Sequence, residues 1–433
     1  MDNSMAPIET TGRYLVLLPE RDVESGIRAL IDSTGINSIA RAIDFEGHTF
    51  TAEQLENDGA SVFDNLGVAV VSLDPDQVQS IRAATASEAA ILAIEPERVV
   101  YAIEISPNMG LSSDYLKGYR DAINHLVDQT MSSESQLAAA AALVNGSATW
   151  GLQTTKVVNT PYSGLGIKVA VLDTGLDLNH PDFAGRTINS QSFIIGEAVQ
   201  DQNGHGTHCI GTACGSKTPS ILPRYGVAYN AEIFAGKVLS NRGSGSDGGI
   251  LAGIEWALTN GCQVISMSLG APTRPGDTYS QVYEQVGQRT LRRGTLIVAA
   301  AGNESRDPST GKRLSPPNPV GYPANAPSLM AVAALNAQLQ IAAFSNSSIN
   351  PKGGQVDIAG PGVDVYSTWP MPTRYRSISG TSMATPHVAG IAALYAEATG
   401  QTGQALWGLL MRDAQRLLLP SVDVGVGLVQ APL

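Results

Sequence analysis

The stretch IKVAVLDTG, residues 167–175, sets the fold of this chain. It is an almost continuous apolar run that ends abruptly in an aspartate, a threonine and a glycine. An apolar run of this kind predicts a strand that is buried on both faces. Its polar end predicts that the chain reaches an open edge of the sheet at Asp173.

Four more apolar runs follow it: AEIFAGKVL at 231–239, CQVISMSLG at 262–270, GTLIVAAAGN at 294–303 and LMAVAAL at 329–335. Helical runs such as 248–259 and 279–293 lie between them. Apolar strands that alternate with helices predict a parallel sheet covered on both faces. The fold class is therefore α/β, with a mainly parallel sheet between two layers of helices.

Polar residues recur where these strands end. Functional groups in such sheets gather beyond the carboxyl ends of the strands. Asp173, Ser268 and Asn303 occupy such positions, and the blocks NGHGTHCIGTACG (203–215) and SISGTSMATPHVAG (377–390) add His205 and Ser382.

Together these residues supply the parts of an acyl-transfer site. Such a site needs a nucleophile, a base, a carboxylate that orients the base, and donors for an oxyanion. The small residues around Ser382 leave space for a substrate, and the helix start behind it offers free NH groups. Taken singly, Asp173 could be a turn residue and Ser382 a helix cap. Their joint occurrence with His205 favours catalysis.

The motifs DTG, HGTH and GTSMATPH, in the order Asp, His, Ser, resemble the active-site blocks of the subtilisin-like serine proteases, the subtilases. GIEWAL, VAAAGNE, VGYPA and GVGLVQAP are similar to that family as well, so the resemblance covers about residues 150–432. It implies a subtilisin-like three-layer fold. It also implies a serine endopeptidase that hydrolyses peptide bonds of polypeptide substrates through an acyl-enzyme intermediate.

The resemblance also implies a role for each residue. Ser382 would be the nucleophile, His205 the general base and acid, Asp173 the orienting carboxylate, and Asn303 an oxyanion donor. Two segments would pair with an extended substrate, and three small residues would line a roomy apolar first pocket. The pairing residues are Ser244, Gly245, Ser268, Leu269 and Gly270, and the pocket residues are Ala301, Gly302 and Gly321.

Residues 1–105 read as a separate small α+β unit. The expected elements are a strand at 14–18, a helix at 23–33, a strand at 67–73, a helix opening at 74–75 and an extended segment at 90–103. This is a ferredoxin-like pattern. It resembles the inhibitory propeptide of subtilases, which implies a self-processing zymogen with its own prodomain as intramolecular inhibitor.

If that likeness holds, cleavage would fall near Ile103 or Glu104. Amphipathic spacing then predicts a helical linker over 106–146, with helices at 114–129 and 133–144. The catalytic domain would occupy 147–433.

The composition of the chain argues against several other classes of protein. The chain has 433 residues and a formal net charge of -12, and it has no basic cluster, which argues against a nucleic-acid partner. No run approaches the ~20 apolar residues of a membrane span. No secretory signal opens the chain, so a cytoplasmic location is expected unless a leader was omitted. The three cysteines lack CxxC spacing and are expected to be free thiols.

Metal and cofactor chemistry receive little support. Asp182 matches a position that often binds calcium in subtilases, but the loop at 216–226, SKTPSILPRYG, does not match the usual ligand pattern. No cofactor is required and no metal site is predicted, although a structural calcium stays open.

Three functions are alternatives to the endopeptidase: a transpeptidase or macrocyclase on the same scaffold, a catalytically silent binding module, and a dinucleotide-binding protein. GLGIKVAVLDTG prompts the last of these, but its glycines precede the strand, where a phosphate-binding loop would follow it.

Overall fold

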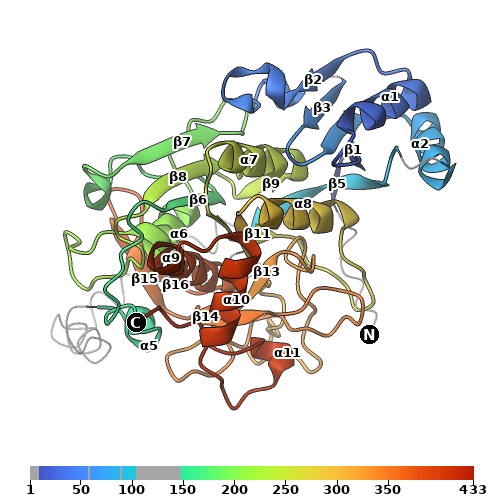
Figure 1. The fold of residues 1–433 in the computed structure, drawn as a ribbon. Helices are drawn as coiled ribbons and strands as arrows, with labels where there is room; N and C mark the ends of the chain where they lie inside the picture. Colours follow the sequence, from blue (N-terminus) through green and yellow to red (C-terminus); the bar gives the residue numbers. More distant parts are fainter. Residues whose placement is uncertain (1–8, 57–58, 88–89, 104–147) are drawn as a thin grey trace.

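The computed structural model describes residues 9–56, 59–87, 90–103 and 148–433 (Figure 1). The linker helices expected within 106–146 lie outside these described residues. A small amino-terminal unit, within residues 9–103, lies over two helices of a larger unit, residues 148–433 (Figure 1). The larger unit carries the Asp, His and Ser motifs and is called the catalytic unit after them. In the described part of the chain, no helix is both long enough and apolar enough to cross a membrane.

A seven-stranded sheet forms the centre of the larger unit. Every neighbouring pair of strands is parallel. In spatial order the strands are β14 (Ile358–Pro361), β13 (Met330–Leu335), β12 (Leu296–Ala300), β10 (Val264–Met267), β6 (Lys168–Asp173), β8 (Glu232–Lys237) and β7 (Ile188–Ser192). The five strands expected from apolar runs are confirmed. The two edge strands, β7 and β14, were not expected from the sequence.

Alternating side chains of the sheet contact two different helix layers. Val169 and Val171 of β6 pack with α6 (His205–Cys214), α9 (Thr381–Thr399) and α10 (Gly403–Asp413). Ala170 and Leu172 pack on the opposite face with α7 (Asp247–Thr259) and α8 (Gln281–Arg292). A strand turns successive side chains to opposite faces, so an apolar run buries both. The predicted three-layer α/β fold is confirmed.

The remaining elements of the catalytic unit are short. They are α5 (Trp150–Thr154), α11 (Ser421–Val424), the strands β9 (Ser244–Ser246) and β11 (Leu269–Gly270), the antiparallel hairpin β15 (Val365–Thr368) and β16 (Tyr375–Ile378), and a 3-10 turn at Pro181–Phe183.

The amino-terminal unit is a sheet with two helices on one face. Its elements are β1 (Thr10–Leu17), α1 (Val23–Thr34), β2 (Ile39–Arg41), β3 (Ala60–Phe63), β4 (Val68–Ser72), α2 (Pro75–Ser87) and β5 (Ala93–Ala102), with 3-10 turns at Ala42–Asp44, Glu46–His48 and Gln54–Glu56. The spatial order is β5-β1-β4-β3-β2, antiparallel except between β2 and β3. The expected elements are present, while β2 and β3 are additional.

The two faces of this small sheet have different partners. Val16 and Leu18 pack with Ile27 and Leu30 of α1 inside the unit. Leu15 and Leu17 belong instead to the core that contains α7 and α8 of the catalytic unit. The period-two alternation of β1 therefore serves two cores at once.

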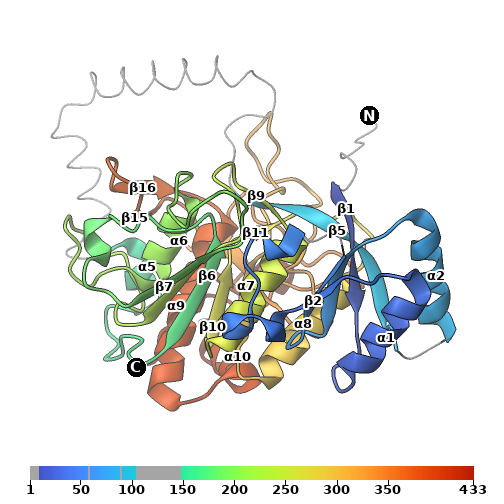
Figure 2. The same ribbon diagram turned by 90° about the horizontal axis from the view of Figure 1, so that it is seen from above.

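Strand β5 connects the units directly. It pairs antiparallel with β1 on its own side and, further along, with both β9 and β11 of the catalytic unit. Figure 2 shows β5 beside these two short strands. The sheet of the amino-terminal unit thus continues into the catalytic unit and places residue 103 at the carboxyl edge of the parallel sheet.

Candidate active site

The first pair of the site is a carboxylate and an imidazole at opposite element ends. Asp173 is the last residue of β6, and His205 is the first residue of α6. The Asp173 Oδ1 atom lies 2.7 Å from His205 Nδ1, and both side chains are buried. The Thr174 backbone NH also donates to Asp173 Oδ1, at 2.7 Å. This second bond fixes the carboxylate so that it orients the imidazole.

Gly204 permits the turn that presents His205. Its φ of 107° lies in the region that favours glycine, and a Cβ there would lie 2.4 Å from the Trp369 ring. Burial of the imidazole is the largest single influence and lowers the pKa of His205, but the charge and hydrogen-bond contributions of Asp173 and Cys209 together outweigh it, so this pKa stands well above the ordinary value.

Ser382 lies one residue inside α9 and faces the end of β5. Its Oγ donates to the Ile103 carbonyl oxygen at 2.8 Å, and the Ser268 carbonyl oxygen, at 3.3 Å, is a second possible acceptor for the same proton. The Nε2 atom of His205 has no hydrogen-bond partner among the described residues. The structure therefore joins Asp173 to His205, while the Ser382 hydroxyl is bonded to the strand in the groove and not to the imidazole.

Asn303, in the loop after β12, lies on the other side of the same carbonyl group. Its Nδ2 donates to the Ile103 oxygen at 2.9 Å, and its Oδ1 accepts from the Thr381 NH and hydroxyl, each at 2.9 Å. The two bonds from Thr381 settle which end of the amide faces Ile103. One carbonyl oxygen thus receives hydrogen bonds from both Asn303 and Ser382.

The residues expected to pair with substrate pair with β5. Gly245 is opposite Val100 and Ser244 opposite Tyr101, while Leu269 is opposite Ala102. Gly270 is opposite Tyr101 on the β11 side of β5.

Ser268, just before β11, contacts the end of β5. Its carbonyl oxygen accepts from the Ile103 NH at 3.4 Å, and its hydroxyl donates to the Ser382 carbonyl oxygen at 2.9 Å. Residues 99–103 are therefore the middle strand of a three-stranded arrangement.

The small residues expected to line the first pocket lie close together. The Gly321 NH donates to the Ala301 carbonyl oxygen at 2.9 Å, and Gly302 directly follows Ala301 with a φ of 107°. A Cβ on Gly270 would lie 3.2 Å from Cδ1 of Ile103. The Ile103 side chain is buried, with 8% of its surface exposed.

The family model described as "Subtilase family" matches residues 164–428 of this chain. The chain belongs to the subtilase family. Three relatives are subtilisin DY from Bacillus licheniformis, subtilisin E from Bacillus subtilis (strain 168) and the alkaline protease of Alkalihalobacillus alcalophilus. They are 42%, 43% and 44% identical over 55%, 54% and 57% of this chain, and the matches cover 80%, 56% and 58% of the relatives.

Membership in this family makes the chain a serine endopeptidase, a hydrolase. The family match begins at residue 164, so the amino-terminal unit lies outside it.

Two carboxylates of β5 bind the N-termini of helices in the catalytic unit, and sequence reasoning missed both of them. Glu97 Oε1 accepts from the Gly248 NH of α7 at 2.8 Å. Glu95 Oε1 accepts from the Gln281 NH of α8 at 2.7 Å, and its other oxygen accepts from the Ser280 hydroxyl at 2.5 Å. Unpaired NH groups at a helix start favour a negative charge. The available signal was the spacing of two acids by two residues, which places both on one face of a strand.

A buried cation of the catalytic unit was missed as well. Here the catalytic unit supplies the hydrogen-bond donor and the amino-terminal unit supplies the acceptors. The Arg289 guanidinium of α8 donates to the carbonyl oxygens of Leu18 at 2.8 Å and Gly67 at 3.1 Å, and also to that of Leu66. Arg289 is 1% exposed. A Cβ on Gly67 would lie 2.2 Å from this guanidinium, so the close approach requires a glycine.

Asp182 occupies the position that often binds calcium in subtilases, and its carboxylate accepts four hydrogen bonds. Its carboxylate accepts from the Ser220 NH and hydroxyl at 2.8 and 2.5 Å, and from the Tyr225 and Tyr375 hydroxyls at 2.6 and 2.8 Å. Burial raises the pKa of Asp182, but these hydrogen bonds together lower it by more than burial raises it, so the pKa lies below the ordinary value. The protein itself thus supplies hydrogen-bond donors for both oxygens of the Asp182 carboxylate.

One group among the described residues has metal-ligand spacing: Asp173, His205 and Cys209, whose ligand atoms lie within 4.8 Å of one another. Two of these ligand atoms, Asp173 Oδ1 and His205 Nδ1, are already bonded to each other at 2.7 Å, and burial raises the pKa of the Cys209 thiol to about 11. This group therefore shows no clear metal site, and the subtilase chemistry needs no cofactor.

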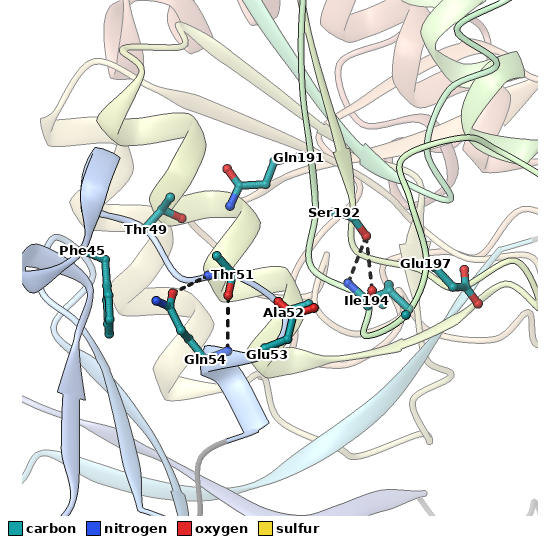
Figure 3. Close-up of a pocket in the computed structure, with 11 residues that line it drawn as sticks. Phe45, Thr49, Thr51, Ala52, Glu53, Gln54, Gln191, Ser192, Ile194 and Glu197 are labelled. Atoms are coloured by element: carbon teal, nitrogen blue, oxygen red, sulfur yellow. Dashed lines mark hydrogen bonds between the residues drawn. The ribbon is translucent and has the colours of Figure 1, made fainter.

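A cavity of about 680 Å³ lies at the seam between the two units and away from the catalytic residues. Figure 3 shows Thr49, Thr51 and Gln54 of the amino-terminal unit opposite Gln191, Ser192 and Glu197 of the subtilase unit. The catalytic groove between β9 and β11 is filled by β5 itself. The seam cavity is therefore separate from the groove that holds β5.

Proposed function

We propose that this subtilase cleaves a peptide bond held between β9 and β11, with Ser382 as nucleophile, His205 as base and acid, and Asp173 as the group that orients His205. One observation carries the proposal: the Ile103 carbonyl oxygen accepts hydrogen bonds from both Asn303 Nδ2 and Ser382 Oγ. A carbonyl group that an amide holds against a serine hydroxyl is placed for attack by the oxygen of that hydroxyl.

The reaction begins with a proton transfer. With its Nδ1–H bonded to Asp173, His205 carries a lone pair on Nε2. The Ser382 hydroxyl, which donates to the Ile103 oxygen in this structure, must first turn to Nε2, which then takes its proton as Oγ attacks the carbonyl carbon. The carbonyl oxygen becomes an oxyanion held by Asn303 Nδ2 and the Ser382 NH. The imidazolium then gives its proton to the leaving amine, and an acyl-enzyme remains. Water, deprotonated by the same imidazole, releases the acid and restores Ser382.

The amino-terminal unit is proposed to be the first substrate and afterwards an inhibitor. The bond between Ile103 and Glu104 follows the carbonyl group that Asn303 and Ser382 hold. The prodomain would span residues 1–105, the linker 106–146 and the catalytic domain 147–433. After cleavage, the contacts of Glu95, Glu97 and Arg289 across the seam would keep the prodomain in the groove.

The test compares the wild-type chain with Ser382→Ala by intact mass and amino-terminal sequencing. We expect the wild type to be cut near the Ile103–Glu104 bond and the variant to stay at full length, because it lacks the nucleophile. A variant that is processed in the same way, or that digests casein at the wild-type rate, would contradict the mechanism.

The transpeptidase alternative differs only in what attacks the acyl-enzyme. Supplying an amine such as glycinamide during peptide cleavage separates the two outcomes by product mass. We expect the free acid as the main product, because hydrolysis needs only water. A predominant amide product would instead indicate peptide-bond transfer.

A further inference from the structure

Strand β5 makes a contact with the catalytic unit well upstream of the bond to be cleaved. Counting Ile103 as the first position, Arg98 is the sixth. Its backbone NH donates to Asp247 Oδ2 at 2.7 Å. Its guanidinium carbon lies 4.1 Å from the centre of the Tyr322 ring. The main chain and the side chain of this one residue thus contact two different groups of the catalytic unit.

The receiving groups form one rigid cluster. The hydroxyls of Tyr283 and Tyr322 both donate to Asp247 Oδ1, at 3.0 and 2.8 Å. The two rings meet edge to face, with centres 5.2 Å apart and an interplanar angle of 80°. Asp247 and Tyr283 are fully buried and Tyr322 is 2% exposed. One carboxylate oxygen therefore holds the rings, while the other is directed at the strand.

This arrangement suits a planar cation. A guanidinium stacked on an aromatic face is attracted by the negative charge density of the ring. A phenol that donates a hydrogen bond to a carboxylate has a more electron-rich ring, which strengthens the attraction between the ring and the guanidinium. The carboxylate itself binds a main-chain NH, which every residue except proline can offer. The cluster can therefore fix the register through Asp247 and select the side chain through Tyr322.

We propose that Asp247, Tyr283 and Tyr322 form a sixth substrate subsite that selects arginine six residues before the cleaved bond. This inference rests on the proposed function, because it treats residues 98–103 as stand-ins for a substrate. The acidic neighbours Glu95 and Glu97 belong to the departing prodomain. Asp247, Tyr283 and Tyr322 all lie in the catalytic unit and remain in the mature enzyme.

The test uses peptides that repeat residues 98–107, acetyl-RVVYAIEISP-amide, and the same peptide with citrulline at the first position. Citrulline keeps the planar shape of arginine but carries no charge. We expect kcat/KM to be roughly threefold to thirtyfold higher for the arginine peptide, the range of a cation–ring contact. A ratio within about twofold of one would overturn the inference.

Two enzyme variants assign the effect to the ring. Tyr322→Phe keeps the aromatic face and should retain most of the arginine preference, while Tyr322→Leu should bring the ratio close to one. The ratio compares two peptides on one preparation, so it does not depend on how much enzyme is folded. If Tyr322→Leu does not fold, the peptide pair on the unaltered enzyme still decides.

A third peptide tests the carboxylate. Methylation of the backbone nitrogen at the sixth position removes the NH that Asp247 accepts, and kcat/KM should fall about tenfold, the order expected for a hydrogen bond to a charged group. No loss would remove Asp247 from the subsite. Failure to cleave any of the peptides would contradict the proposed function itself, whereas equal cleavage of all of them would contradict only the subsite.

Discussion

At the scale of single residues, the charge of Asp173 decides when His205 can act as a base. The two side chains share a 2.7 Å contact in a buried setting. An imidazolium is stabilised by this neighbour, and a neutral imidazole is what catalysis needs. The same contact that orients the base thus also sets the pH below which it stops working.

We expect kcat/KM to fall as the pH drops through a value above 6.5, because Asp173 holds the pKa of His205 above that ordinary value. Asp173→Asn removes the negative charge, so burial then dominates and the apparent pKa should move downward, with a much lower rate. Peptide hydrolysis measured between about pH 5 and pH 9 checks both effects. Asp364→Asn, at an exposed carboxylate, is the control, and an unmoved profile in Asp173→Asn would contradict the assignment.

The residues proposed to be catalytic could be singled out from the sequence because each lies in a short motif at the end of an element. The contacts of Glu97, Asp247 and Arg289 could not be predicted. Glu97 lies 151 positions from Gly248, and Arg289 lies 271 positions from Leu18. A carboxylate that binds a distant helix start has the same local sequence as one on an open surface.

At the scale of elements, each apolar run identified a central strand, and the edges escaped prediction. β7 reads INSQS and has no fully buried position, while β14 reads IAGP and is only four residues long. β14 is buried at every position and escaped prediction only because it is short, whereas β7, at the other edge, pairs on one side only, so that its sequence is under less pressure to be apolar. β2, with three half-buried residues at the edge of the amino-terminal sheet, escaped for the same reason.

Glu97→Gln in the Ser382→Ala background should lower the free energy of unfolding by about 1–3 kcal/mol. The buried carboxylate binds the start of α7 and also pairs with Arg13 at 2.7 Å, and glutamine keeps the shape but not the charge. Chemical denaturation measures the loss.

Glu20→Gln is the matched control for Glu97→Gln. Glu20 also reaches α8 from the amino-terminal unit, through Arg292 at 2.6 Å, but this pair is exposed. Exposed pairs contribute little, so its loss should stay below about 1 kcal/mol. Equal effects of the two substitutions would show that the charge at the α7 start does not hold the units together.

At the scale of the whole molecule, the seam between the units contains buried carboxyl groups. Glu255 of α7 accepts from the Asn65 NH and side-chain amide of the amino-terminal unit, at 3.0 and 2.7 Å. Burial raises the pKa of Glu255 to about 7, although the bonds from Asn65 oppose this. The folded chain therefore binds a proton here that the unfolded chain has already lost.

This difference predicts a pH dependence of stability. Between the ordinary pKa of 4.5 and about 7, only the folded state carries the proton, so the contribution of Glu255 to stability falls as the pH rises through this window. Glu255→Gln cannot titrate. We expect the free energy of unfolding of this variant relative to its parent, both in the Ser382→Ala background, to rise by about 1–3 kcal/mol from pH 5 to pH 8.

The same comparison with Glu53→Gln, at an exposed carboxylate, should give a difference that does not change with pH. A flat difference for Glu255→Gln as well would mean that its carboxyl group titrates alike in the folded and unfolded chains.

Strand β5 lies between β9 and β11 and pairs with both. Its departure after the proposed cleavage would leave a gap one strand wide, about 9–10 Å across, with unpaired backbone groups on each side. Only a polypeptide that is already unpaired and straight can slot into such a gap, and helices or existing sheets are too thick. The mature protease would therefore cleave substrates at locally unfolded segments, and a well-folded protein would resist digestion until part of it unfolds.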